Sequence, residues 1–138
     1  MSTRTWVIVA TLSWGFWAFA LKKAVDEMSP LAAWVAYGCT LVLLVPVALL
    51  LGRLWGISLR YPTQGTAWAV AAAVFVGIGV FALLSAMRGG EASQTVALTA
   101  TYPAVTLVLC IVFLREPLTM SRALGVVVLC AGAYLVSR

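Results

Sequence analysis

The sequence predicts an all-α membrane protein, and three observations lead to that class. Five apolar runs fill almost the whole 138-residue chain. Hydrophobic residues make up 64% of it and charged residues 9%, whereas soluble domains carry about 25% charged residues. The runs lack the alternating pattern of a barrel strand, and only helices and closed barrels satisfy their backbone groups in lipid. We therefore expect five transmembrane helices.

Each expected span has about the length that a bilayer requires. A helix rises ~1.5 Å per residue, so ~20 residues cross a hydrocarbon core that is ~30 Å thick. Every interruption is too short to fold alone, which predicts a single transmembrane domain, 1–138. The spans cover approximately residues 6–21, 31–51, 67–87, 96–114 and 118–136.

The first span resembles a signal peptide only superficially. Ala18-Phe19-Ala20 follows an apolar run as a cleavage site would. However, Trp14 and Trp17 suit the core of a signal peptide poorly, and Lys22-Lys23 follow at once. We expect a retained helix.

Turn and cap residues separate the next spans. Residues 26–29 are expected to form a short turn, with Ser29 as the N-cap and Pro30 as the first helical residue of the second span. Pro46 is expected to bend that span. Residues 115–117 close the fourth span, where we expect Glu116 to fix a loop.

The positively charged residues are divided almost evenly between the two sides of the membrane. The positive-inside rule needs an imbalance to choose one orientation, and five charges against four give almost none. We expect dual topology; the alternative is one orientation fixed by one or two strong charges or by a partner. Arg4, Arg53, Arg60, Arg115 and Arg122 lie on one side, and Lys22, Lys23, Arg88 and Arg138 on the other.

Composition excludes several classes of function. The basic residues lie at span ends, so the net charge of +5 does not indicate nucleic-acid binding. No histidine is present, and no buried acid pair or nucleophile motif is found, so we expect neither an enzyme nor a metal or cofactor. The three cysteines, Cys39, Cys110 and Cys130, are interpreted as packing residues rather than as a disulfide or redox site.

Several motifs together resemble one repeat of the EamA type of the drug/metabolite transporter superfamily. Ser13-Trp14-Gly15-Phe16, followed by Lys23 and Ser29-Pro30, is similar to the opening pattern of that family. Tyr102-Pro103-Ala104-Val105 and Phe113 to Thr119 resemble its mid-helix proline and its Gly-Glu-x-Leu-Thr motif, with Arg115 in place of the glycine. The last span resembles the closing helix of this type and of the small multidrug resistance proteins.

The resemblance implies half of a transporter. EamA-type proteins usually carry two five-span repeats of opposite orientation, which hold substrate near the midplane and move by alternating access. This chain contains one repeat, so the missing half must come from a second copy or from a related five-helix chain. We expect an antiparallel homodimer in the cell (inner) membrane.

Hydroxyl side chains form a stripe on the fourth span. They are Thr95, Thr99, Tyr102 and Thr106, spaced so that they share one helix face. Pro103 lies within the stripe and is expected to bend the helix, act in gating and free a backbone carbonyl near Thr99. The stripe either lines a cavity or forms hydrogen bonds between helices.

Aromatic residues offer a second candidate surface. Trp14 and Trp17 lie inside the first span, although Trp prefers the membrane interfaces. They are interpreted as an aromatic wall for an organic substrate, or else as gap fillers between helices. Tyr37 is a further candidate pore residue, whereas Trp34 is expected to anchor the span at the interface.

Small residues predict where helices pack. Gly125, Val128 and Gly132 lie close to one face of the last span, and small residues allow close approach of helices in lipid. The resemblance of this span to the closing helix of the small multidrug resistance proteins implies that it forms the dimer contact. The small multidrug resistance proteins rely on a glutamate embedded in the first helix, and the matching stretch of this chain, residues 14–17, contains no acid. A carboxylate-based cation antiporter is therefore disfavoured.

The preferred function is therefore transport of a small organic solute, uncharged or zwitterionic and amino-acid-like, by alternating access. Two alternatives remain. One is a subunit of a heteromeric flippase for lipid-linked sugars, and the other is a membrane assembly subunit that does not transport.

Overall fold

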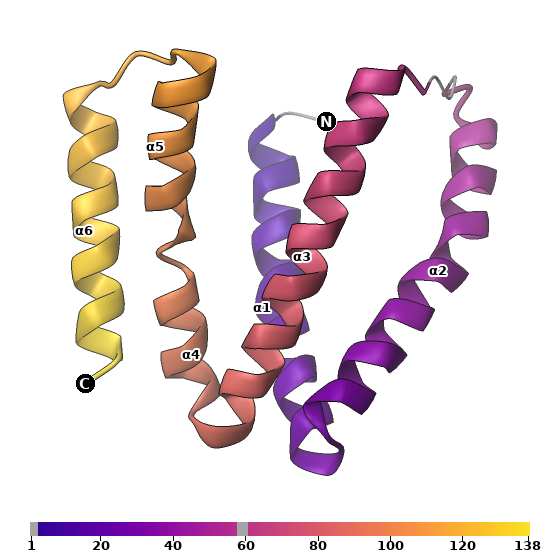
Figure 1. Ribbon diagram of the computed structural model, residues 1–138, viewed down its shortest axis with the longest axis horizontal. Coiled ribbons are helices and arrows are strands. Elements are labelled where there is room, and N and C mark those ends of the chain that lie inside the picture. The colour runs from indigo at the N-terminus through magenta and orange to yellow at the C-terminus, as the bar shows by residue number, and fades with distance from the viewer. Residues whose placement is uncertain (1–2, 58–60) are drawn as a thin grey trace. The chain divides into compact units, whose positions relative to one another are not determined.

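The computed structural model of the chain describes residues 3–57 and 61–138, and these residues form helices joined by short connections, with no strand. The predicted all-α class is confirmed. Arg60, which entered the count of charges, lies outside the described residues. Figure 1 shows the helices in chain order: α1 (Thr3–Glu27), α2 (Pro30–Leu54), α3 (Thr63–Gly89), α4 (Ala92–Thr99), α5 (Tyr102–Leu114) and α6 (Met120–Val136).

Four apolar segments are long enough to cross a membrane. They are α1, α2, α3 and the segment Ala92–Leu114, which comprises α4 and α5. The expected fifth span contains α6, a helix of 17 residues. At ~1.5 Å per residue α6 is about 26 Å long, slightly less than the hydrocarbon core, a mismatch that local thinning of the bilayer accommodates.

The chain divides into two compact units, which are described separately. The first consists of the described residues of Met1–Phe19 together with Gly89–Arg138, and the second is Ala20–Arg88.

The core of the Ala20–Arg88 unit lies where α1 ends, α2 begins and α3 ends. Leu84 and Met87 of α3 have no exposed surface. The apolar side chains buried with them come from all three helices: Leu21, Val25, Ala33, Val80 and Leu83. Burying one such side chain contributes about 1.5–3 kcal/mol when its surroundings are water, but packing and hydrogen bonds dominate where helices meet in lipid.

Two basic residues at this end, one on α1 and one on α3, each cap the end of the other helix. The Lys22 ammonium of α1 donates to the Met87 carbonyl in the last turn of α3 (3.0 Å) and pairs with Asp26 (2.8 Å). In return, the Arg88 guanidinium of α3 donates to the Met28 carbonyl at the end of α1 (3.3 Å). Carbonyls of a last helical turn lack intrahelical donors, so these reciprocal caps satisfy two of them.

The turn between α1 and α2 is shorter than expected. Asp26 belongs to α1, which ends only at Glu27, because its pairing with Lys22 one turn earlier supports a further turn of helix. The predicted cap of α2 is confirmed: the Ser29 hydroxyl accepts a hydrogen bond from the Ala32 amide (3.2 Å), and Pro30 begins the helix. The helix continues through Pro46.

Trp34 links α2 to α3 rather than only anchoring the span. Its indole Nε1 donates to the Gly77 carbonyl (2.8 Å), and its ring meets the edge of Phe81 at 6.2 Å between centroids. An added Cβ at Gly77 would lie 3.8 Å from the indole, so the small residue leaves room for this contact. The sequence showed an interfacial aromatic residue but not its partner on another helix.

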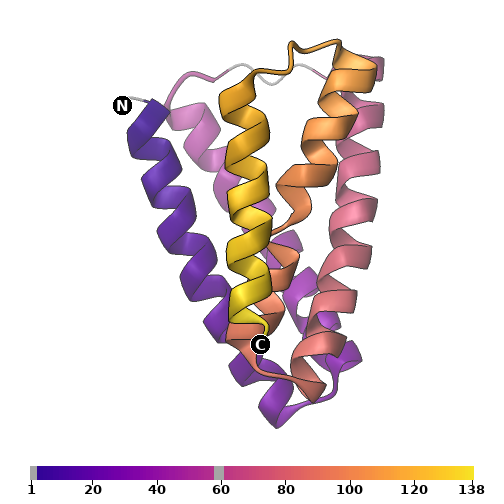
Figure 2. The same cartoon turned by 90° about the vertical axis from the view of Figure 1, so that its left-hand side faces the viewer.

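In the other unit, α6 runs beside α4 and α5 in the opposite direction (Figures 1 and 2). Neither α4 nor α5 carries a buried residue. The connection from α5 to α6 begins at Arg115, which adopts a left-handed conformation (φ 54°, ψ 33°). The Arg115 and Glu116 amides both donate to the Cys110 carbonyl, the latter at 3.2 Å, so α5 ends in a left-handed residue, with arginine where glycine is usual.

Candidate functional site

The fourth apolar segment is interrupted at Ala100 and Thr101, between α4 and α5. Pro103 has no amide hydrogen to donate to the Thr99 carbonyl. The Ala104 amide donates to the Thr101 carbonyl (2.9 Å) in place of the Ala100 carbonyl. Two consecutive carbonyls, those of Thr99 and Ala100, therefore lose the donors that a continuous helix would supply.

Threonine hydroxyls stabilise the interruption. Thr101 donates from Oγ1 to the Leu98 carbonyl (2.7 Å), and Thr99 donates to the carbonyls of Thr95 (3.0 Å) and Val96 (2.9 Å). These side-chain bonds compete with the helical ladder and favour a bend. Each hydroxyl proton is used within its own segment, so the hydroxyl oxygens remain as acceptors.

The predicted hydroxyl stripe follows the same pattern throughout. Thr95 donates to the Glu91 carbonyl (2.9 Å), and Thr106 donates to the Tyr102 carbonyl (3.3 Å). Thr95 is half-buried, whereas Thr99, Tyr102 and Thr106 are exposed. The three threonines thus donate to backbone one turn earlier and not to a neighbouring helix.

A groove of about 520 Å³ lies between α5 and α6 and starts at the interruption. Tyr102 and Thr106, from the stripe, line its inner end beside Pro103. Its middle is apolar, and its far end is polar. The remaining lining residues are Leu107, Cys110, Glu116, Ser121, Arg122, Gly125, Val126 and Leu129.

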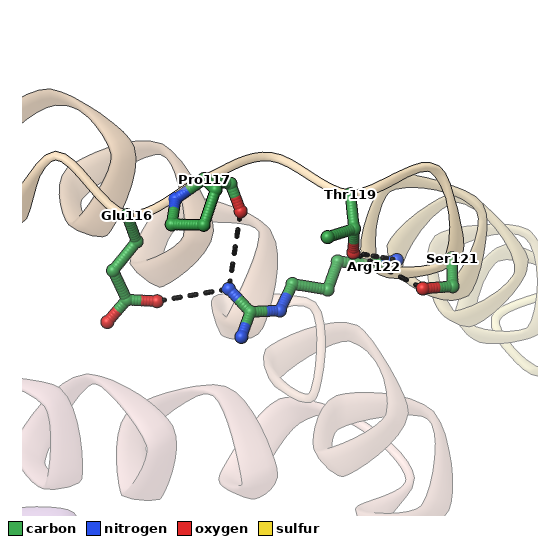
Figure 3. Close-up of polar contacts among 5 residues, drawn as sticks. All are labelled: Glu116, Pro117, Thr119, Ser121 and Arg122. Carbon is green, nitrogen blue, oxygen red and sulfur yellow. Dashed lines mark hydrogen bonds and ion pairs between the residues drawn. The ribbon is translucent and has the colours of Figure 1, made fainter.

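An ion pair forms the polar far end of the groove (Figure 3). Arg122 Nη1 lies 3.2 Å from Glu116 Oε2 and also donates to the Pro117 carbonyl (3.4 Å). Thr119 caps α6 by accepting from the Arg122 amide (3.4 Å), and its hydroxyl lies 3.2 Å from that of Ser121. Both charged side chains are about half exposed, and the pair therefore contributes little to stability, about 0–1 kcal/mol.

Arg122 was not among the candidate site residues from the sequence. Glu116 was expected to fix a loop, and its partner proves to be six residues later in the chain. Thr119, an N-cap residue three positions before Arg122, is the feature of the sequence that could have predicted this pair. The cap determines where α6 begins, and therefore which side chain can reach back to Glu116.

The small residues of α6 have no close neighbour in the described chain. A Cβ added at Gly125 or at Gly132 would meet no other atom within 4 Å, and Val128 is 69% exposed. Gly125 also lines the groove. This face therefore remains open to a second molecule or to lipid.

The aromatic candidates do not join the groove. Trp14 is 62% exposed and Trp17 half-buried on α1, and Tyr37 is half-buried on α2 in the other unit. A second groove, of about 590 Å³, follows one face of α2, but its lining from Trp34 to Leu43 is almost entirely apolar. Binding sites need convergent polar groups for specificity, which favours the α5–α6 groove.

Among the described residues, no three His, Cys, Asp or Glu side chains gather into one group. All three cysteines are free; Cys39 is exposed, and Cys110 and Cys130 are half-buried.

Comparison with known proteins places this architecture in a family. The chain matches the EamA-like transporter family over residues 1–138. It is 33% identical over 115 residues to an uncharacterized protein of Methanocaldococcus jannaschii, an alignment that covers 83% of this chain and 82% of that protein. No solved structure matches the chain. The chain thus belongs to the EamA-like transporter family and is a multi-pass membrane protein of the drug/metabolite transporter superfamily.

Proposed function

We propose that this protein transports a small uncharged or zwitterionic organic solute by alternating access, as an antiparallel homodimer in the cell's inner membrane. The interrupted segment and the α5–α6 groove form half of its transport path. A second copy supplies the other half.

The observation that carries the proposal is the interruption itself. Ala100 lies about 12 Å along the segment from Ala92, at ~1.5 Å per residue, which places it at membrane depth. Unsatisfied backbone at that depth costs several kcal/mol against lipid, and irregular backbone occurs there only where it is buried in protein or lines a wet cavity. Interrupted helices of this kind mark solute sites in transporters built from inverted repeats.

Exposure supports a missing partner. Because α4 and α5 bury no residue and the glycines of α6 meet no neighbour, these three helices do not cover the interruption by themselves. The near balance of positive charge makes a second copy in the opposite orientation the simplest cover.

The test is solute counterflow with the purified protein alone in liposomes, screened with neutral and zwitterionic metabolites. For the solute that is transported, Thr99→Val and Tyr102→Phe should reduce the initial rate, because each removes a polar atom beside the interruption. Two matched substitutions away from it should leave the rate unchanged. Thr40→Val removes the same kind of hydrogen bond, from Thr40 to the Ala36 carbonyl (2.9 Å), and Tyr61→Phe changes an exposed tyrosine.

Two results would overturn the proposal. If no solute exchanges until a second gene product is added, the chain is a subunit of a heteromeric carrier, such as a flippase. If both site variants transport as well as the parent protein, the stripe and the interruption have only a packing role.

A further inference from the structure

The α4–α5 interruption leaves two consecutive backbone carbonyls as free hydrogen-bond acceptors. The carbonyls of Thr99 and Ala100 have lost their helical donors, as described above. The hydroxyl protons of Thr99 and Thr101 are used on carbonyls of α4. What these residues offer to a ligand is therefore oxygen lone pairs.

From this arrangement we infer that the Thr99 and Ala100 carbonyls bind a primary ammonium group of the transported solute. An ammonium carries three donors and no acceptor, so one group satisfies both carbonyls at once. A hydroxyl has a single proton and would leave one carbonyl without a donor. This inference rests on the proposed transport function and narrows its substrate class to zwitterions that carry a primary amine.

The charges along the segment are compatible with a cation. Both carbonyls lie at the C-terminal end of α4, where the helix dipole is negative, and the positive end of α5 begins two residues later, at Tyr102. The segment Ala92–Leu114 contains no Lys or Arg that would repel a cation. It also contains no Asp or Glu, so the backbone oxygens take the part that a carboxylate has in other cation sites.

The groove provides space for the rest of such a solute. It begins at Tyr102 and Pro103, one residue beyond the two carbonyls, and continues over Leu107 and Val126. An apolar substituent on the amine can lie along these side chains. A neutral polar group on the solute can reach the Tyr102 hydroxyl.

The experiment uses two probes with the same apolar tail and opposite charge, isoamylamine and isovalerate. Each is titrated calorimetrically into the full-length protein in nanodiscs, in choline chloride buffer free of Na⁺. The structure predicts that isoamylamine binds and that isovalerate does not. Pro103→Ala restores an amide that donates to the Thr99 carbonyl, and should weaken isoamylamine binding about tenfold, the effect of losing one hydrogen bond to a charged group.

A matched proline provides the control. Pro46→Ala makes the same substitution in α2, whose helix continues through that position, and should leave binding unchanged. Pro103→Gly restores the same amide without favouring a continuous helix, so it separates the loss of a free carbonyl from straightening of the segment. Both Pro103 variants should weaken binding, and circular dichroism checks that they fold.

Four results would overturn the inference. Isoamylamine can bind both Pro103 variants as tightly as the parent protein, or isovalerate can bind as well as the amine. In a third arm, Na⁺ can bind with an affinity that depends on Pro103 while isoamylamine fails to compete, which would assign the carbonyls to a coupling ion. If counterflow instead identifies a transported solute that has no amine, the transport function stands and this inference alone is wrong.

Discussion

Arg115 offers a test of the local structure that places Glu116 and Arg122 at the end of the groove. Its φ of 54° is in the left-handed region, and it is the one described residue other than glycine with a positive φ. Glycine adopts this conformation without a Cβ clash, and it is the usual left-handed residue at the C-terminal end of a helix. Replacing Arg115 with glycine should therefore stabilise the protein.

Two opposing terms set the size of the effect. The left-handed conformation costs an ordinary residue about 1–2 kcal/mol. Glycine loses about 0.5–1 kcal/mol more backbone entropy on folding than alanine does. The Arg115 side chain forms no hydrogen bond or ion pair with the described residues, so no contact is lost. The net expectation is a free energy of unfolding that rises by about 0.5–1 kcal/mol.

The assay is SDS-induced unfolding in mixed micelles, followed by circular dichroism. Arg115→Gly should raise the midpoint and Arg115→Asn should raise it less, because asparagine tolerates this conformation better than most residues. Arg115→Val should lower it. Arg115→Gln keeps the strain and removes the charge, so it should leave the midpoint unchanged. If the glycine variant is as unstable as the valine variant, the conformation assigned to Arg115 is wrong.

Two further predictions concern the contacts of the Ala20–Arg88 unit. Lys22→Met removes the ammonium that donates to the Met87 carbonyl, and should lower the free energy of unfolding by about 1–2 kcal/mol in the same assay. Lys23→Met, at an exposed neighbour, should change it little. Equal losses in both variants would mean that the hydrogen bond from Lys22 contributes nothing specific. Trp34→Phe removes the indole donor to α3 and should cost about 0.6–2 kcal/mol, against almost none for Trp68→Phe, whose side chain is 72% exposed. A Trp34→Phe variant as stable as the parent would contradict that contact.

Helix positions could be predicted from the sequence because length and hydropathy alone decide which segments cross a bilayer. The first, second and third apolar runs correspond to α1, α2 and α3, each extended by several residues at its ends. These extensions depend on polar contacts that hydropathy does not report. Asp26 was assigned to a turn, yet it is helical and pairs with Lys22.

The candidate site was predictable in part. Pro103 indicated a disturbed helix, but the interruption lies at Ala100 and Thr101, where side-chain bonds from Thr101 compete with the ladder. The pairing of Glu116 with Arg122 depends on where α6 begins, and a pairing across six residues has no helical periodicity to reveal it. The roles of Trp14, Trp17 and Tyr37 in solute binding stay predictions.

The central claim is that two copies of opposite orientation form one transporter, and a complementation measurement tests it most directly. Lys23→Gln with Arg138→Gln leaves five positive charges on one side and two on the other. Arg4→Gln with Arg53→Gln and Arg60→Gln leaves two against four in the other direction, so each of the two variants should insert in a single orientation. A topology reporter at the C-terminus verifies this. The account predicts that neither variant transports alone and that co-expression of the two restores transport. Transport at the parental rate by either variant alone, in one verified orientation, would contradict it.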